Sequence, residues 1–196
     1  MSEGYAQVKR EAQARQAALD AWCREHFKQD ETLVLELGCG HGHFLNAYAA
    51  DYPGRTCLGV DLISRRVEKA QSKAAKHGLE RLFFHKAEAA ELLSSLASVC
   101  RLETIFMLFP DPWPKKRHHK NRMIQPALLE QLSMLTVPGG QFCFRTDHDG
   151  YFFWAVERLY AHPSWTISSD TAWPFEAPTV FQERMSAWRS LVAIRT

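Results

Sequence analysis

Residues 35–44 read LELGCGHGHF, and this stretch decides the fold that the sequence predicts. An apolar run, TLVLEL (32–37), leads into it and is typical of a buried strand. Alternating glycines then follow, at Gly38, Gly40 and Gly42. A helix is expected to begin near His43. A buried strand that turns through glycines into a helix is the usual opening of an α/β domain.

The rest of the chain repeats this alternation of short apolar runs and amphipathic stretches. The apolar runs predict strands at 56–61, 82–86, 104–109, 141–147 and 191–195. The amphipathic stretches predict helices from Ser64, as N-cap, to a stop at Gly78, then over 88–97, near 124–136, and around 152–159. Pro138-Gly139-Gly140 predicts a turn between a helix and a strand. The alternation indicates a doubly wound, mostly parallel α/β sheet with helices on both faces.

Length and composition favour one such domain, preceded by a helix. The chain has 196 residues, of which 46% are hydrophobic, enough for one sizeable core. Residues 3–28 predict an amphipathic helix, with apolar side chains on one side: Val8, Ala12, Leu19, Trp22, Cys23 and Phe27. We therefore expect an N-terminal helix over 1–30 and the main domain over 31–196.

Charge and cysteine usage limit the classes of protein. The formal net charge is only +2, so any basic surface has to be local. The five cysteines include no C-x-x-C pair, which is typical of reduced thiols rather than of a disulfide framework or a zinc site. The polar N-terminus and the lack of a long apolar run predict neither a signal peptide nor a membrane span, and a cytoplasmic location. The histidines His41, His43, His118, His119 and His148 match no familiar metal-ligand spacing, so no metal is expected.

The glycine turn and two acidic residues predict a ligand site at the carboxyl ends of the strands. A dinucleotide fingerprint would need glycine at position 43, where this chain has His43. Asp61 closes the second strand, where a carboxylate can accept hydrogen bonds from ribose hydroxyls. Glu36 stands just before the turn and suits a cationic group. A ligand with a ribose and a cation but no pyrophosphate suggests S-adenosylmethionine; a tight turn with incidental acids, or NAD, are the alternatives.

The segment FPDPWPKKRHHKNR (109–122) places a proline-stiffened apolar turn directly before a basic run. Its single carboxylate is Asp111, which taken alone reads as a turn-former between two prolines. Five Lys or Arg and two His follow it. A solvated loop does not need Phe109, Trp113 and three prolines, whereas a core element would not carry these charges. The segment therefore predicts contact with a polyanion next to the ligand site.

These motifs together resemble a known family, the bacterial-type tRNA (guanine-N7)-methyltransferases, which are class I S-adenosylmethionine-dependent enzymes. The resemblance rests on LELGCGHGHFL, GVD, FPDPWPKKRHHKNR, PGGQFCFRTD and TVFQER. It runs from about residue 32 to the C-terminus, and FPDPWPKKRH is its most specific part. It implies the Rossmann-like fold of class I methyltransferases and the formation of N7-methylguanosine in the variable loop of tRNA.

The resemblance also implies roles for individual residues. Glu36, Asp61 and Glu88, with the glycines of the turn, are expected to contact S-adenosylmethionine. Asp111 matches the position regarded as catalytic and adjoins the cofactor. The substrate-binding positions are Lys115, Asp147, Thr179, Val180, Phe181 and Gln182. The residues expected to meet tRNA phosphates are Lys116, Arg117, His118, His119, Lys120 and Arg122.

Two departures from the family pattern leave alternatives open. The family commonly has Asp where this chain has Glu88, and Glu where it has Gln182. Loss of the second charge affects guanine recognition, so a methyltransferase for another RNA or a small molecule is the first alternative. A non-catalytic RNA-binding relative is the second. The sequence leaves open whether the chain is a monomer or a homodimer, and which tRNAs it would use.

Overall fold

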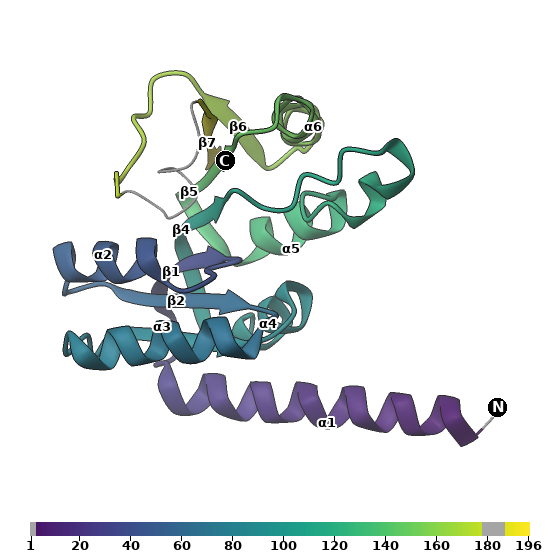
Figure 1. Cartoon of the computed structure of the whole chain (residues 1–196), viewed down its shortest axis with the longest axis vertical. Helices are drawn as coiled ribbons and strands as arrows, with labels where there is room; N and C mark the ends of the chain where they lie inside the picture. Colours follow the sequence, from purple (N-terminus) through teal and green to yellow (C-terminus); the bar gives the residue numbers. More distant parts are fainter. Residues whose placement is uncertain (1–2, 178–186) are drawn as a thin grey trace.

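One sheet with helices on both faces forms the frame of the molecule (Figure 1). Within residues 3–177 and 187–196, which the computed structural model describes, seven strands pair in the order β3-β2-β1-β4-β5-β7-β6. They are β1 (Glu31–Leu37), β2 (Thr56–Asp61), β3 (Leu82–Lys86), β4 (Cys100–Leu108), β5 (Thr136–Thr146), β6 (Trp165–Ser168) and β7 (Arg189–Arg195). Strands β1 to β5 run parallel to one another, whereas β7 runs antiparallel to both β5 and β6.

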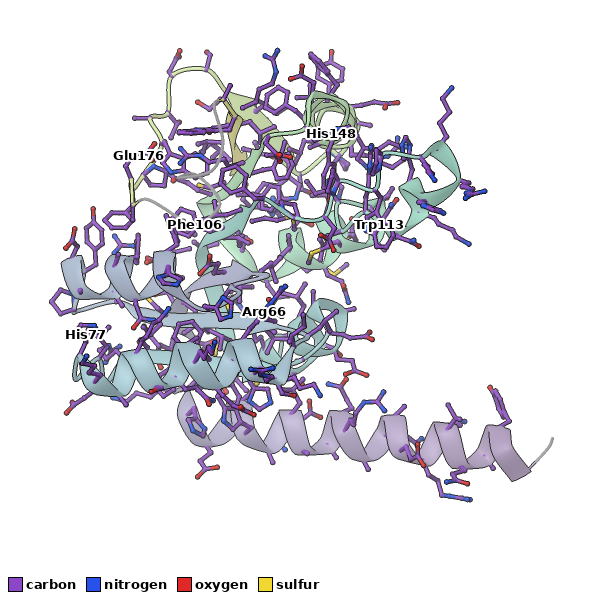
Figure 2. The ribbon with its side chains drawn as sticks, viewed as in Figure 1. Arg66, His77, Phe106, Trp113, His148 and Glu176 are labelled. Carbon is purple, nitrogen blue, oxygen red and sulfur yellow. The ribbon has the colours of Figure 1, made fainter. Side chains whose placement is uncertain are left out.

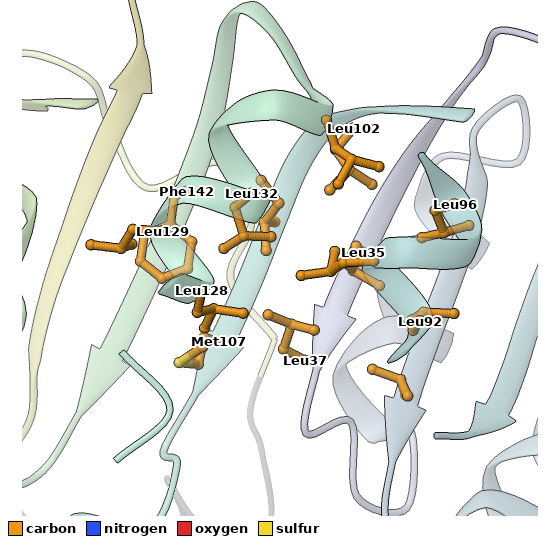
Figure 3. Packing of buried hydrophobic residues seen from close by; sticks show 14 of the residues in the cluster. Leu35, Leu37, Leu92, Leu96, Leu102, Met107, Leu128, Leu129, Leu132 and Phe142 are labelled. Atoms are coloured by element: carbon orange, nitrogen blue, oxygen red, sulfur yellow. The ribbon is translucent and has the colours of Figure 1, made fainter. Parts of the chain in front are cut away.

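The helices bury the two faces of this sheet in separate clusters. They are α1 (Glu3–His26), α2 (His43–Asp51), α3 (Ser64–Lys76), α4 (Ala89–Leu96), α5 (Pro126–Leu135) and α6 (Asp149–Tyr160), with a 3₁₀ helix η1 (Lys116–Asn121). Side chains of α1, α4, α5 and α6 share one cluster, part of which Figure 3 shows, with Leu35 and Phe142 of the sheet packed among leucines of α4 and α5. Side chains of α2 and α3 pack on the opposite face. Burial on both faces explains why the central strands are almost uninterrupted apolar runs.

The predicted strands at 56–61 and 82–86 are confirmed, and three other predictions need correction. β4 begins at Cys100 rather than at 104, because its first residues alternate between buried and exposed and so lack an apolar run. Pro138-Gly139-Gly140 lies inside β5 instead of forming a turn, where the pairing with β4 shifts register. β6 was not predicted, since this four-residue strand pairs only with β7 at the edge of the sheet.

Helix α3 ends as predicted but begins differently. Gly78 has φ +63°, and the amides of Gly78 and Leu79 donate to the carbonyls of Ala75 and Ala74, a Schellman motif. Ser64 is the first helical residue instead of the N-cap. The N-cap is Ile63, which has no side-chain hydrogen bond to offer.

Helix α1 is buried along only half of its length. Leu19 and Cys23 near its C-terminal end, and Phe27 directly after it, belong to the core, whereas Tyr5 and Val8 are 59% and 65% exposed. The predicted apolar face is therefore covered at one end only, and Figure 1 shows the N-terminal end of α1 extending beyond the sheet. None of the helices in the described residues is long and apolar enough to cross a membrane.

Candidate functional site

The order of the strands brings the glycine turn and the 109–122 loop to the same edge. β1 lies between β2 and β4, so the chain moves outward from β1 in one direction through β2 and β3, and in the other through β4 and β5. This reversal is the topological switch point at which parallel α/β sheets bind ligands. The turn after β1 and the loop after β4 both leave the carboxyl ends of these adjacent strands. The predicted site is thus assembled at one edge of the sheet.

The glycines of the turn serve two different purposes. All have positive φ, at +77° for Gly38, +53° for Gly40 and +69° for Gly42. A Cβ on Gly42 would lie 2.7 Å from both Ala70 Cβ and Phe84 Cζ, so Gly42 allows the turn to pack on α3 and β3. A Cβ on Gly38 or Gly40 would meet nothing within 4 Å. The space over these two glycines is therefore open, which suits a ligand that approaches the backbone closely.

Asp61 fixes the turn from the end of β2. The amide of Gly40 donates to its Oδ2 at 3.0 Å and that of Ile63 to its Oδ1 at 2.8 Å. Arg66 Nη1 lies 3.6 Å from Oδ2. A carboxylate offers about four lone-pair sites, so each oxygen of Asp61 retains capacity for a ligand hydroxyl. The position predicted for ribose recognition thus also sets the shape of the turn.

Glu36 is a buried carboxylate with an oxygen left open. It is only 4% exposed, and its Oε2 has no hydrogen-bond partner among the described residues. The backbone N–H of Leu45, in the first turn of α2, donates to the carboxylate. Burial, with the charge of Asp61 adding to it, raises the pKa of Glu36 to about 8. A buried acid of this kind is expected to bind a cation or to remain protonated, which fits the ammonium group of S-adenosylmethionine.

The raised pKa of Glu36 predicts a specific dependence of stability on pH. The carboxyl titrates at 4.5 when unperturbed, so between pH 4.5 and about 8 the folded protein holds one proton more than the unfolded chain. Its contribution to stability is complete below pH 4.5 and is lost as the pH rises, by about 1.4 kcal/mol per pH unit. Glu36→Gln cannot titrate, so its stability relative to the parent is expected to increase steadily from pH 5.5 to 7.5. Urea unfolding without ligand at three pH values measures this; parallel curves would contradict it.

The loop after β4 is held in a strained and well-anchored conformation. Phe109 and Trp113 have positive φ, at 49° and 43°, which is unusual for bulky residues and is typical of functional sites. The amide of Phe109 donates to the carbonyl of Arg145 on β5 at 2.8 Å. Asp111, between these strained positions, is exposed to solvent. The prolines and these anchors therefore present Asp111 to solvent just beyond the carboxyl end of β4.

Arg122 contradicts the prediction that it meets tRNA phosphates. It is 3% exposed, and its guanidinium donates to the carbonyls of Pro112, at 2.9 Å, and Gly150, at 3.2 Å. It also lies 5.0 Å from the ring centre of Tyr151 and 5.2 Å from that of Trp154, on α6. Arg122 therefore holds the loop against α6 from the inside.

The other basic residues of the segment lie on its outer side. Lys115, Lys116, Arg117 and Lys120 are exposed, and three of them stand on η1. The rings of His118 and His119 are half-buried and lie edge-on to Trp113 and Trp154. The four exposed cations follow Asp111 closely in the chain, whereas His118 packs against Trp113, which Figure 2 labels, and His119 packs against Trp154 of α6.

The remaining predicted site residues are Asp147, Glu88 and residues 179–182. Asp147 is exposed directly after the end of β5, and Glu88 is exposed as the N-cap of α4, without a side-chain capping bond. Both leave the same edge of the sheet as Asp61 and Asp111. The predicted substrate positions Thr179, Val180, Phe181 and Gln182 lie outside the described residues.

Arg145 is a residue of this region that sequence reasoning missed. It is 3% exposed and donates to both oxygens of Glu176, at 2.9 and 2.7 Å, and to Ser190 Oγ at 2.8 Å. Its guanidinium also stacks 4.1 Å from the ring centre of Trp173. Arg145 thus joins the segment before residue 178 to the start of β7, next to the loop of Asp111. No sequence pattern signals a contact between residues so far apart.

Comparison with known proteins gives the family. A family model described as "Putative methyltransferase" matches residues 30–191. The tRNA (guanine-N(7)-)-methyltransferase of Rhodospirillum rubrum is 35% identical over 158 residues, covering 81% of this chain and 59% of that protein. That of Rhizobium etli is 31% identical over 169 residues, covering 80% of this chain and 73% of that protein. The chain belongs to the tRNA (guanine-N7)-methyltransferase family.

Several family members are longer than this chain. The chain spans 59% of the Rhodospirillum rubrum protein and 55% of the Halorhodospira halophila one, which is 41% identical over 128 residues. The family model begins at residue 30, so α1 precedes the matched region.

Solved structures confirm the predicted fold. The aminoglycoside resistance methyltransferase NpmB1 aligns with a TM-score of 0.64 at 20% identity, covering 90% of this chain and 93% of that one. TrmN from Thermus thermophilus aligns with a TM-score of 0.60 at 16% identity, covering 92% of this chain and 49% of that one. The Rossmann-like class I methyltransferase fold, which the family resemblance implied, is the fold of this chain.

Proposed function

We propose that this protein transfers a methyl group from S-adenosylmethionine to N7 of a guanine in the variable loop of tRNA. The observation that carries the proposal is that an open glycine turn, a buried carboxylate with an unpaired oxygen and the loop of Asp111 all lie at the carboxyl edge of β1 and β4. The membership of the chain in a family with this named activity supports it.

The residues at this edge of the sheet fit S-adenosylmethionine, whose sulfonium supplies an electrophilic methyl group. Glu36 would pair its open oxygen with the ammonium group, and this ion pair would favour the ionised carboxylate. Asp61 would accept hydrogen bonds from the ribose hydroxyls. Gly38 and Gly40 leave the space that the amino acid portion requires, and Glu88 would accept from the adenine edge.

The reaction makes modest demands on the protein. Guanine N7 carries a lone pair and no proton, so no general base is needed to expose the nucleophile. The protein has to hold N7 in line with the methyl–sulfur bond, and such positioning can lower the barrier by roughly 7–11 kcal/mol. Positive charge moves onto the purine during the transfer. Asp111 would stabilise this charge and accept hydrogen bonds from the N1–H and N2–H₂ edge, with Asp147 or Gln182 sharing that edge.

The exposed cations of the 109–122 loop would bind the tRNA backbone. Lys115, Lys116, Arg117 and Lys120 are exposed beside Asp111, where phosphate contacts would fix the register of the RNA. Arg122 is left out of this set because it is buried. The target guanine lies in folded RNA, so the proposal includes its unstacking, which would bring the base to Asp111. We assign this activity to residues 31–196, with the helix over 1–30 as an addition, and place it in the cytoplasm together with tRNA.

Methyl transfer to defined RNA tests the proposal. The chain is incubated with isotopically labelled S-adenosylmethionine and unmodified tRNA transcripts, and the labelled nucleoside is then identified and mapped. Label in N7-methylguanosine at the variable loop is the expected result. Label on another RNA or on a small molecule would move the substrate elsewhere, with Gln182 the first residue to test. Binding of tRNA without cofactor binding or transfer would indicate a non-catalytic RNA-binding protein.

A further inference from the structure

Helix α3 and the glycine turn together form a second cluster of cations. Lys73 Nζ donates to the carbonyl of His41 at 2.9 Å and lies 2.8 Å from Nε2 of His43, so it links the helix to the turn. Lys69 precedes it by one helical turn on the same side, and Arg65 precedes Lys69 by another. We call His41, Arg65, Lys69 and Lys73 the α3 basic face. Arg65, Lys69 and His41 are exposed.

The charge pattern of α3 works against the stability of the helix. The helix carries five Lys or Arg and a single acid, Glu68. Arg65 and Arg66 lie in its first turn, where the helix dipole disfavours positive charge, and that turn contains no acidic residue. The N-cap Ile63 supplies no side-chain hydrogen bond to compensate. Local stability therefore does not explain why cations occupy these positions.

The cations also repel one another. The pKa of His41 is lowered, by burial first and then by Lys69 and Lys73, and that of Lys73 is lowered by burial and by Lys69. Within residues 3–177 and 187–196, Arg66 alone among the Lys and Arg of α3 forms a salt bridge, with Asp61. The positive charge of the α3 basic face is thus left largely unneutralised by the protein itself. An external polyanion would relieve this repulsion.

The position of α3 in the fold favours RNA over a membrane surface as the polyanion that this face binds. The helix starts immediately after the carboxyl end of β2, so its first turn stands at the edge of the sheet that carries the glycine turn and the loop of Asp111. Figure 2 shows Arg66 toward the side of Trp113, with His77 at the far end of the helix. A membrane surface would require exposed apolar side chains on α3. On α3 itself Val67, Ala70 and Ala74 are buried, and the exposed apolar residue is the small Ala75; the larger exposed side chains Leu62 and Ile63 precede the helix, at the end away from Lys73.

We propose that the α3 basic face is a second contact surface for the RNA backbone, at the same edge of the sheet as the cations of the 109–122 loop. The inference rests on the proposed function, since it extends the RNA-binding surface of the same site. An RNA strand that lies along this edge would then be held at two places, with phosphates on α3 and on η1.

Charge-removing substitutions on α3 test this inference. The variants are Lys69→Gln and the double change Arg65→Gln with Lys69→Gln, and the matched control is Lys76→Gln, in the last turn of the same helix. The dissociation constant for a tRNA transcript is measured from 0.05 to 0.5 M salt. Each lost phosphate contact lowers the slope of log affinity against log salt by about 0.7–0.9. The double variant is expected to lose about 1.5 in slope and at least roughly tenfold in affinity at 0.1 M salt.

Further readouts separate RNA contact from a structural role. The thermal midpoint of the double variant should equal or exceed that of the parent, because a cation is removed from the positive end of the helix dipole. Affinity for S-adenosylmethionine and turnover at saturating tRNA should be unchanged, while KM for tRNA rises. Lys76→Gln should keep the parent salt slope.

An unchanged salt slope in the double variant would overturn the inference. Loss of binding to anionic lipid vesicles, with tRNA affinity retained, would also overturn it and would assign the face to a membrane. A reduced slope in a protein that forms no N7-methylguanosine would retain this surface while rejecting the proposed function. Normal methylation with an unchanged slope would reject this surface alone.

Discussion

Asp111→Asn is expected to lower methyl transfer at saturating tRNA by at least about a hundredfold, the usual effect of removing an electrostatic stabiliser of a transition state. Asparagine keeps the size of the side chain and removes the charge that would stabilise the developing guanine cation. Asp111→Ala, which also loses both acceptor oxygens, is expected to abolish transfer. Single-turnover rates with labelled S-adenosylmethionine measure both variants.

The affinity for tRNA is the control for Asp111. The side chain is exposed on a loop anchored by Arg122 and Phe109, so its replacement should leave the fold and most phosphate contacts intact. Lys115→Ala is the matched comparison, with weaker tRNA binding and a smaller loss of rate at saturation. Near-parental turnover of Asp111→Ala would show that the role given to this carboxylate is wrong.

Two glycines of the same turn are expected to respond to alanine in different ways. Gly42→Ala places a methyl group 2.7 Å from Ala70 and Phe84 and in a left-handed conformation. Strain and overpacking each cost about 1–2 kcal/mol, so about 3 kcal/mol of the free energy of unfolding should be lost. Gly40→Ala has the same strain but open space around it. It should lose only about 1–2 kcal/mol while weakening S-adenosylmethionine binding at least roughly tenfold, because its methyl group fills the space meant for the ligand.

Urea unfolding and calorimetric titration of the cofactor measure this contrast. A domain of this size has a free energy of unfolding of roughly 5–15 kcal/mol, so both proteins should remain folded at room temperature. Equal losses of stability in the two variants would contradict the packing described for Gly42. Undiminished cofactor binding by Gly40→Ala would contradict an approach of the ligand over this glycine.

The sequence was sufficient where local pattern alone determines the structure. The strands at 56–61 and 82–86 are apolar runs buried on both faces, and Gly78 meets a backbone requirement at the end of α3. Elements that depend on distant partners could not be predicted. The start of β4 is polar and pairs because β1 and β5 lie beside it, and β6 exists only through its pairing with β7.

The same distinction applies to the site. The rule that ligands bind at the carboxyl ends of strands placed Asp61 at the ligand edge, and the family resemblance placed Asp111 beside the cofactor. The rule gives no information on burial, so the open oxygen of Glu36 emerged only from the structure. Arg122 ends a basic run and was predicted to meet tRNA phosphates, whereas its guanidinium lies inside the loop against Tyr151 and Trp154. Arg145 was missed because its partners follow it by about thirty residues or more in the chain.

The anchoring of the 109–122 loop by Arg122 has a thermodynamic consequence for RNA binding. The entropy of ordering this loop is lost when the protein folds, because Pro112 and α6 already hold it. Association with RNA should therefore lack the large negative heat-capacity change that accompanies coupled folding, as far as this loop is concerned. Its cations would meet an incoming strand as a rigid array, which favours rapid, electrostatically steered encounter that slows as salt is added.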